Sequence, residues 1–478
     1  MNFAIIRCNL GLILRIFALL MLLPVAVGLI YGENILNFVL TIAATLLVSL
    51  LLSHSKPKNR RLFAKEGFVI VAIAWILISA LGALPFVISG SIPNYIDAFF
   101  ETVSGFTTTG SSVVSDIELM PRSDLFWRCF THWIGGMGVL VFAFAIMPLS
   151  SEHSMHLMRA EVPGPTVAKL VPRTKSTARI LYIIYLVLTL VQTVLLMLGG
   201  LSLYDALLHS FATAGTGGFS TYSASIAHFD SVYVEMVCSV FMLIFSVNFG
   251  LYFLVLIGRP LQAIKNEELR WFGSIVVGTT LAIAVGISGM FDSFPTALRH
   301  AFFNVCSIIS TTGFCTVDFN LWPEFTKWLL ILLMFCGACA GSTGGGLKVS
   351  RIAVLLKCAV CEVRETARPR SINRVRLDGK ALENNSVHGI LVFFLLYICL
   401  FLLFAFIISF DGFDVTTTFT AALTCISNVG PGLSLVGPTG NFAIFSPLSK
   451  LALSFAMLFG RLEIYPLIVL LSRSTWRR

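Results

Sequence analysis

Charged residues are scarce in this sequence. Asp, Glu, Lys and Arg make up 12% of its 478 residues, about half the share found in soluble globular domains. Hydrophobic residues make up 57%, and the mean hydropathy is +0.89. This shortage of charge excludes a soluble protein. The apolar runs suit membrane-spanning helices of about 20 residues and are too long for the strands of a membrane β-barrel.

The positive charge that is present gathers in a few segments. The net charge is +9, and Lys and Arg cluster at 54–65, 152–179, 258–270 and 348–380, each after an apolar run. Short loops rich in Lys and Arg stay in the cytoplasm. We therefore expect a multi-pass membrane protein with both termini in the cytoplasm. The same distribution explains the net charge without nucleic acid as a partner.

The sequence also lacks the clusters that an enzyme or a nucleotide site needs. His132, His209 and His300 are scattered over three parts of the chain, whereas catalysis needs its acid and base groups at one place. The glycine-rich stretch 337–348 superficially resembles a phosphate-binding loop, but Leu347 separates the last glycine from Lys348. We expect no enzymatic activity and no nucleotide bound to this chain.

Four copies of one glycine-centred segment stand between the apolar runs. They are 107–111, 215–219, 310–314 and 427–431. A ring of backbone carbonyls from such loops can replace the water shell of a cation, and glycine allows the orientations required. The four segments predict a selectivity filter with potassium or another cation at its carbonyls. The candidate filter residues are Thr108, Thr109, Gly110, Thr216, Gly217, Gly218, Thr311, Thr312, Gly313, Asn428, Val429 and Gly430.

The residues before each shared glycine keep the same register. Thirteen residues earlier the sequence has a polar residue, then Ala, then two large apolar residues, beginning at Asp97, Asp205 and His300; the fourth copy, at Thr417, has diverged. About ten helical residues fit before each loop, too few to cross a membrane. We expect half-helices whose C-terminal ends, with partial charges of about −0.5, favour cations without a ring of acidic side chains.

These patterns predict an all-α integral membrane protein with two N-terminal transmembrane helices and four helix–pore-loop–helix repeats around a central pore. The expected units are a hairpin at 1–55, then repeats at 62–150, 176–258, 268–360 (with a broken second helix) and 384–478. A signal peptide at 9–30 is the alternative for the first run. Arg15 within that run, and a second apolar run at 35–53, favour the uncleaved hairpin.

Two further features concern the passage of ions. Glycines interrupt the third repeat's second run at 337–348, and a broken helix at membrane depth must be buried in protein or line water. A structural kink is the alternative. Arg461 lies twelve residues before Arg473, about 18 Å along a helix, so it faces the bundle interior or a wet cavity. An interhelical ion pair with Glu463 or another carboxylate is its alternative role.

The chain resembles the bacterial Trk/Ktr potassium-uptake family, and within it the pore-forming membrane subunits. The resemblance lies in the four glycine segments and in the motifs at 133–138, 340–348 and 430–432, and it covers nearly the whole chain. It implies potassium as the transported ion, because Gly110 stands where related sodium transporters have Ser. The remaining alternative is a secondary transporter of another cation or solute.

The resemblance also implies how flux is controlled. It points to an intramembrane gate below the filter, with Arg461 as a pore arginine. The residues of this gate are Gly341, Ser342, Thr343, Gly344, Gly345, Gly346, Lys348 and Arg461. The implied partners are a TrkA-type cytosolic regulatory subunit that binds NAD or ATP, and a second copy of the chain in a homodimer. The implied location is the bacterial inner membrane.

Overall fold

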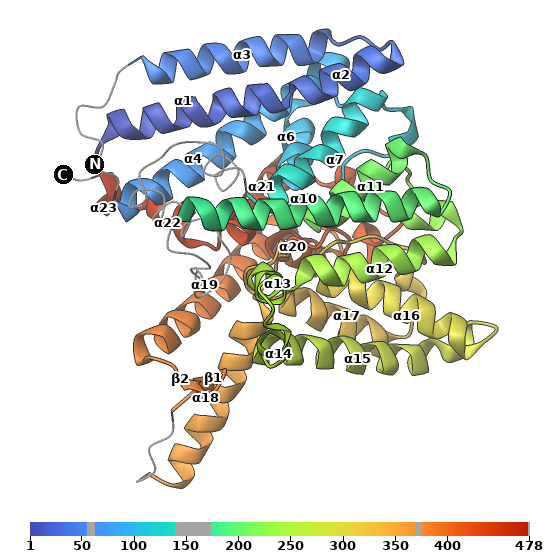
Figure 1. The fold of residues 1–478 in the computed structure, drawn as a ribbon, viewed down its shortest axis with the longest axis vertical. Helices are drawn as coiled ribbons and strands as arrows, with labels where there is room; N and C mark the ends of the chain where they lie inside the picture. The colour runs from blue at the N-terminus through green and yellow to red at the C-terminus, as the bar shows by residue number, and fades with distance from the viewer. Residues whose placement is uncertain (55–62, 139–173, 370–373, 477–478) are drawn as a thin grey trace.

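The protein is an assembly of helices (Figure 1). The structure, a computed structural model, describes residues 1–54, 63–138, 174–369 and 374–476. Within them, strand structure is limited to one antiparallel hairpin of β1 (Arg376–Leu377) and β2 (Lys380–Ala381). The expected all-α membrane fold is therefore confirmed. Most of the basic segment 152–179, and the end of the first expected repeat at 139–150, lie outside the described residues.

The N-terminal unit is a helical hairpin. It consists of α1 (Phe3–Leu20), α2 (Leu22–Tyr31) and α3 (Leu36–Ser53), and α1 and α3 run side by side along one edge of the molecule (Figure 1). Gly11 lets the two helices approach closely, because a Cβ there would lie 2.1 Å from the Ser53 hydroxyl oxygen. The Ser49 hydroxyl donates to the Gly11 carbonyl at 2.6 Å.

Four short helices occupy the positions of the expected half-helices. They are α6 (Tyr95–Phe106), α11 (Leu203–Gly215), α16 (Phe294–Ile309) and α20 (Val415–Ser427). Each begins at a polar residue whose side chain accepts a backbone hydrogen bond, a strong start signal for a helix; these residues are Asn94, Ser202, Ser293 and Asp414. With 12 to 16 residues, each is about 18 to 24 Å long and ends inside the protein.

Longer helical segments flank each short helix. The segments before it are α4 (Ala64–Gly82) with α5 (Leu84–Ser89), α10 (Thr174–Leu198), α15 (Glu267–Ile287) and α19 (Asn384–Ile408). The segments after it are α7 (Arg122–Gly136), α12 (Val232–Ser246) with α13 (Phe249–Leu256), α17 (Glu324–Cys336) with α18 (Val349–Ala367), and α21 (Pro447–Arg461) with α22 (Tyr465–Leu471). The minor helices are α14 (Pro260–Ile264) and α23 (Arg473–Trp476), with short 3-10 turns at Ile117–Leu119, Ser225–Phe229, Ser288–Met290, Phe319–Leu321, Ser409–Asp411, Ser434–Val436 and Phe442–Ile444.

Among the described residues, six helices are long and apolar enough to cross a membrane, or eight if each of two bent pairs is one span. The bent pairs are a correction to the sequence analysis, which expected a break only in the third repeat. The α12–α13 pair bends by 91° and the α21–α22 pair by 119°. Asn248 caps α13 after the first bend, while Pro466 and the positive φ of Glu463 and Ile464 form the second. Capping and proline interrupt the helical hydrogen bonds at both bends.

The four repeats close into a ring. The segment that ends each repeat packs on the short helix of the next one: α7 on α11, α12 on α16, and α17 on α20. The last segment, α21, packs on α6 of the first repeat. This cyclic order brings the four loops that follow the short helices to one central axis.

Candidate functional site: a ring of four glycine loops

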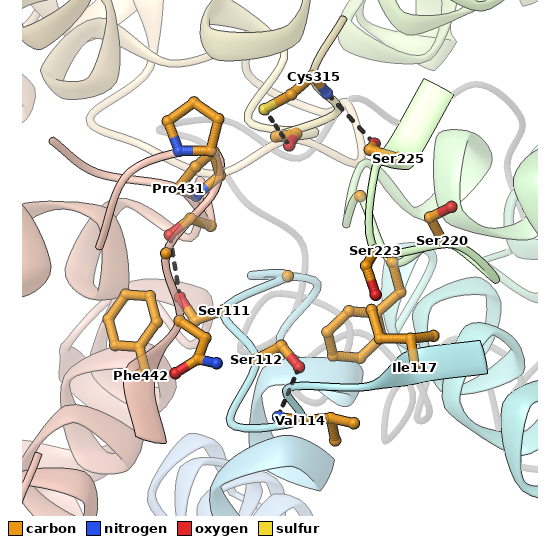
Figure 2. A pocket seen from close by; sticks show the side chains of 18 of the residues that line it. Ser111, Ser112, Val114, Ile117, Ser220, Ser223, Ser225, Cys315, Pro431 and Phe442 are labelled. Atoms are coloured by element: carbon orange, nitrogen blue, oxygen red, sulfur yellow. Dashed lines mark hydrogen bonds between the residues drawn. The ribbon is translucent and has the colours of Figure 1, made fainter. Parts of the chain in front are cut away.

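The four shared glycines meet at one cavity of about 150 Å³. Figure 2 shows it encircled by the four loops, with Ser111 and Ser112 from the first, Ser220 and Ser223 from the second, Cys315 from the third and Pro431 from the fourth. The cavity lies on the side of the ring where the chain continues after each glycine.

Each glycine faces the carbonyl of the residue that precedes the next glycine. A Cβ at Gly110 would lie 1.9 Å from the Gly217 oxygen, and one at Gly218 would lie 2.0 Å from the Thr312 oxygen. The same contact is 2.3 Å from Gly313 to the Val429 oxygen and 2.7 Å from Gly430 to the Thr109 oxygen. The backbone therefore forms a closed ring in the order of the repeats, with no room for a side chain at any of the four glycines.

All four loops share one backbone conformation. The residue two positions before each glycine has positive φ, at 54° for Thr108, 56° for Thr216, 60° for Thr311 and 56° for Asn428. The glycines themselves have φ of 82°, 79°, 81° and 105°. Positive φ is uncommon for threonine and is held only where the surroundings over-determine it, often at functional sites. Sequence analysis predicted the glycines but missed these left-handed residues.

The side chains around the ring form hydrogen bonds that support its backbone. The Thr109 hydroxyl hydrogen-bonds to that of Thr107 at 2.7 Å and accepts from the Asn428 amide at 2.9 Å. The Ser111 hydroxyl donates to the Gly430 carbonyl at 3.1 Å, which joins the first loop to the fourth. The structure thus brings the four loops that carry the twelve predicted filter residues together around one cavity.

The glycine-rich loop between α17 and α18 lies against the opposite side of the ring from the cavity. Its Gly345 N–H donates to the Thr311 hydroxyl at 2.7 Å, and its Gly346 N–H donates to the Ser427 carbonyl at 2.9 Å. A Cβ at Gly344 would lie 2.9 Å from the Ser310 oxygen. Because Gly344, Gly345 and Gly346 have no side chains, this part of the loop packs directly on the C-terminal ends of α16 and α20.

Two buried cations hold the loop. The Lys348 ammonium donates to the Gly344 carbonyl within the loop itself. The Arg461 guanidinium donates to the Thr343 carbonyl at 2.6 Å, and also to the carbonyls of Gly135 and Gly136 at the end of α7. Both side chains are buried, at 2% and 6% exposure. Arg461 therefore ties the loop to the first repeat across the central axis.

The structure does not pair Arg461 with Glu463, which was one of the carboxylates considered for its alternative role. The Glu463 carboxylate is bound by Arg351 of α18, with nitrogen–oxygen distances of 2.6 and 3.2 Å. The chain bends sharply between α21 and α22. The side chains of Arg461 and Glu463 therefore have different partners although they are close in sequence.

Sequence analysis missed Glu268, which holds both ends of the glycine-rich loop. Its Oε1 accepts from the Ala340 N–H at 2.7 Å and from the Ser350 N–H at 3.1 Å, and the side chain is buried. An acidic residue at the start of an apolar run was the available signal, because a buried carboxylate needs partners.

We expect Glu268→Ala to destabilise the protein. It leaves two buried N–H groups without an acceptor, at about 1–3 kcal/mol each, whereas Glu268→Gln keeps an acceptor oxygen and loses less. Thermal unfolding of the purified protein in detergent measures both variants. Equal melting temperatures for Glu268→Ala and the parent would contradict the role assigned to this carboxylate.

An acidic residue next to the cavity lining links two loops. The Ser223 backbone N–H and hydroxyl donate to Glu118 at 2.8 and 2.7 Å, joining the first and second repeats. The hydrogen bond from the Ser223 backbone holds the pKa of Glu118 below its ordinary value. This carboxylate therefore stays negative at neutral pH beside the cavity, where it favours cations.

The three histidines do not form a catalytic cluster in the structure. His132 bridges the first two loops, with its ring bonded to the Gly105 carbonyl and the Phe219 N–H. His209 contacts Ser220 at 2.9 Å, and His300 lies beside Thr316. His132 and His209 thus both contact the second loop, and His300 contacts the third.

Known proteins of similar sequence and structure are ion transporters. A family model described as "TrkH: Cation transport protein" matches residues 34–477. The Trk system potassium uptake protein TrkH of Salmonella typhimurium is 38% identical, and that of Escherichia coli K12 is 37% identical, each over the whole of both chains. The crystal structure of the potassium transporter TrkH from Vibrio parahaemolyticus matches with a TM-score of 0.89 and 35% identity, covering 100% of each chain.

Proposed function

The chain belongs to the TrkH family of cation transport proteins, and on that premise we propose that it carries potassium into the cell through the ring of four glycine loops. The observation that carries this proposal is the closed contact between each glycine and the carbonyl before the next one. Such a ring presents backbone oxygens to an ion that has lost its water. The C-terminal ends of four short helices add negative potential at the same place.

Potassium is the ion that we assign to the ring. The curated relatives are potassium uptake proteins by name, and glycine stands at all four ring positions of this chain. The twelve loop residues named above are the proposed filter, and potassium is its cargo. The repeat boundaries predicted from the sequence are the units that we propose build this pore.

We propose that the glycine-rich loop, with Lys348 and Arg461, is a gate for this pore. The loop packs under the third and fourth filter loops through Thr311 and Ser427. Its contacts are mostly backbone hydrogen bonds and glycine surfaces, which can separate without rearranging bulky side chains. The positive charges of Lys348 and Arg461 also oppose the passage of a potassium ion.

Removing the gate should increase flux. Deletion of Gly344 to Gly346 takes away the part of the loop that contacts α16 and α20, so potassium flux into proteoliposomes should rise several-fold. Discrimination against sodium should remain, because the ring itself is unchanged, and this serves as the internal control. A fall in flux in well-folded protein would reject the loop as a gate and favour a purely structural kink.

We also propose an orientation and partners for the chain. The two termini meet, with the rings of Phe3 and Trp476 stacked at 6.1 Å and Lys65 bonded to the Ser474 carbonyl (Figure 1). We place both termini in the cytoplasm and the chain in the inner membrane of a bacterium, because the Lys- and Arg-rich segments of the sequence mark the cytoplasmic side. The projecting α18 and the β1–β2 hairpin then offer a cytoplasmic surface for a TrkA-type nucleotide-binding subunit. A homodimer is the proposed assembly.

A further inference from the structure

A buried ion pair lies behind the ring, between the first and second filter loops. Glu101 belongs to the short helix α6, and Arg128 belongs to α7. The Arg128 Nε lies 2.6 Å from the Glu101 Oε1, and the two side chains are 2% and 0% exposed. A fully buried pair of this kind is costly to desolvate and is weak evidence for stability alone, so its other contacts indicate what it does.

The Glu101 carboxylate binds the chain just after the first glycine. The Ser112 hydroxyl donates to its Oε1 at 2.9 Å, and the Val113 N–H donates to its Oε2 at 2.9 Å. Ser112 and Val113 directly follow Gly110 and Ser111. Glu101 therefore fixes the outer end of the first filter loop to its own half-helix.

The Arg128 guanidinium binds the equivalent stretch after the second glycine. Its NH1 donates to the Ser220 carbonyl at 3.0 Å, and its central carbon lies 3.6 Å from the centre of the Phe219 ring. That ring stacks on His132 with centroids 4.1 Å apart. Arg128 is thus held by Glu101 on one side and by the second filter loop on the other.

Among the described residues, the printed contacts between filter loops at the other three junctions are hydrogen bonds, and the ion pairs found there, Glu235–Arg299 and Asp97–Lys450, join helices instead of filter loops. Cys315 of the third loop contacts Ser225 of the second through a backbone-to-hydroxyl bond of 3.3 Å. The fourth loop meets the third through Asn320 and Ser434, and the first through Ser111 and Gly430. The first junction differs because its ion pair binds the chain after the glycine in both neighbouring loops.

We propose that Glu101 and Arg128 are positioning residues for selectivity: their ion pair fixes the spacing of the first and second filter loops. This inference rests on the proposed filter. A carbonyl ring discriminates between ions by the number and placement of its oxygens, and the planar fork of arginine sets two contacts at a defined separation. Neither side chain contacts the ion in this account.

The pair also has an electrostatic consequence. Arg128 is one of the residues that line the cavity above the ring, and Glu101 neutralises its charge. Loss of the carboxylate leaves a positive charge beside the cation pathway, whereas loss of the guanidinium leaves a negative one. The two single variants should therefore change the KM for potassium in opposite directions, which a merely structural defect would not do.

The test measures potassium and sodium uptake by purified protein in proteoliposomes for Glu101→Gln and Arg128→Gln. We expect potassium-over-sodium discrimination to fall about tenfold in both, equivalent to about 1.4 kcal/mol. The KM for potassium should rise in Glu101→Gln and fall in Arg128→Gln. If Arg128→Gln fails to fold, Arg128→Lys replaces it: the charge and KM should be kept while discrimination falls, because an ammonium cannot hold Glu101 and Ser220 in the same fork.

Asp97→Asn is the matched control. Asp97 stands one turn before Glu101 on the same helix, and its ion pair with Lys450, at 2.7 Å, joins α6 to α21 instead of joining two filter loops. We expect unchanged discrimination in this variant. The inference is overturned by parental discrimination in folded Glu101→Gln and in the folded Arg128 variant, or by an equal loss in Asp97→Asn.

Gly110→Ser, measured in parallel, separates this inference from the proposed function. Lost discrimination in Gly110→Ser, together with parental discrimination in the Glu101 and Arg128 variants, overturns the positioning role alone. Parental discrimination in Gly110→Ser as well overturns the proposed filter.

Discussion

Serine at position 110 should remove most of the discrimination between potassium and sodium. The added Cβ would lie 1.9 Å from the Gly217 carbonyl oxygen, so the second loop must move or rotate that carbonyl. A change of about 1.4 kcal/mol in the relative binding of the two ions alters their ratio tenfold, and displacement of one oxygen of the ring is sufficient for that. Uptake of each ion into proteoliposomes measures the ratio.

Gly90→Ser is the control for backbone strain. Gly90 has φ of 81°, close to the 82° of Gly110, but a Cβ there would meet nothing within 4 Å. Both variants therefore carry the cost of a side chain in the left-handed region, about 1–3 kcal/mol, and only Gly110→Ser crowds the ring. Unchanged discrimination in well-expressed Gly110→Ser, or an equal loss in Gly90→Ser, would count against the filter.

Neutralising Arg461 should speed potassium flux about thirtyfold. Two unit charges about 8 Å apart repel by about 2 kcal/mol at an effective dielectric constant of 20, and that energy on the barrier gives this factor. Arg461→Gln also weakens the bonds from the guanidinium to the Thr343 carbonyl and to the end of α7, which frees the glycine-rich loop. The initial rate of potassium flux into proteoliposomes with matched protein amounts provides the measurement.

Arg461→Lys separates charge from tethering. It keeps the positive charge and loses the planar fork that spans the loop and α7. A slow Lys variant beside a fast Gln variant assigns the barrier to charge, and two fast variants assign it to the tether. Glu463 needs no compensating change, because Arg351 holds its carboxylate. Flux no faster than the parent in stable Arg461→Gln protein would reject Arg461 as part of the gate.

The sequence predicted those parts of the fold that depend on local pattern. The N-terminal hairpin follows from two apolar runs, and the four half-helices follow from polar caps and short apolar stretches before each shared glycine. The cyclic closure of the four repeats agrees with the expected pore architecture. The glycines at 110, 218, 313 and 430 could be recognised in the sequence, because their backbone conformation and close packing require a residue without a side chain.

The features of the fold and of the site that the sequence did not predict depend on contacts between residues that are far apart in the sequence. Glu101 and Arg128 are 27 residues apart, and Glu268 lies 72 residues from Ala340, so no local period brings either pair together. The left-handed backbone of Thr108 is imposed by the ring and runs against the ordinary preference of threonine. The bends after Ser246 and Arg461 lie within runs apolar enough to read as continuous spans.

The permeability ratio of potassium to sodium for the purified protein in liposomes tests the central claim most directly. The ring of four glycine loops predicts potassium flux through the purified chain, with a ratio well above one that Gly110→Ser lowers. Equal permeability to the two ions would contradict a potassium-selective ring and favour a secondary transporter of another cation or solute.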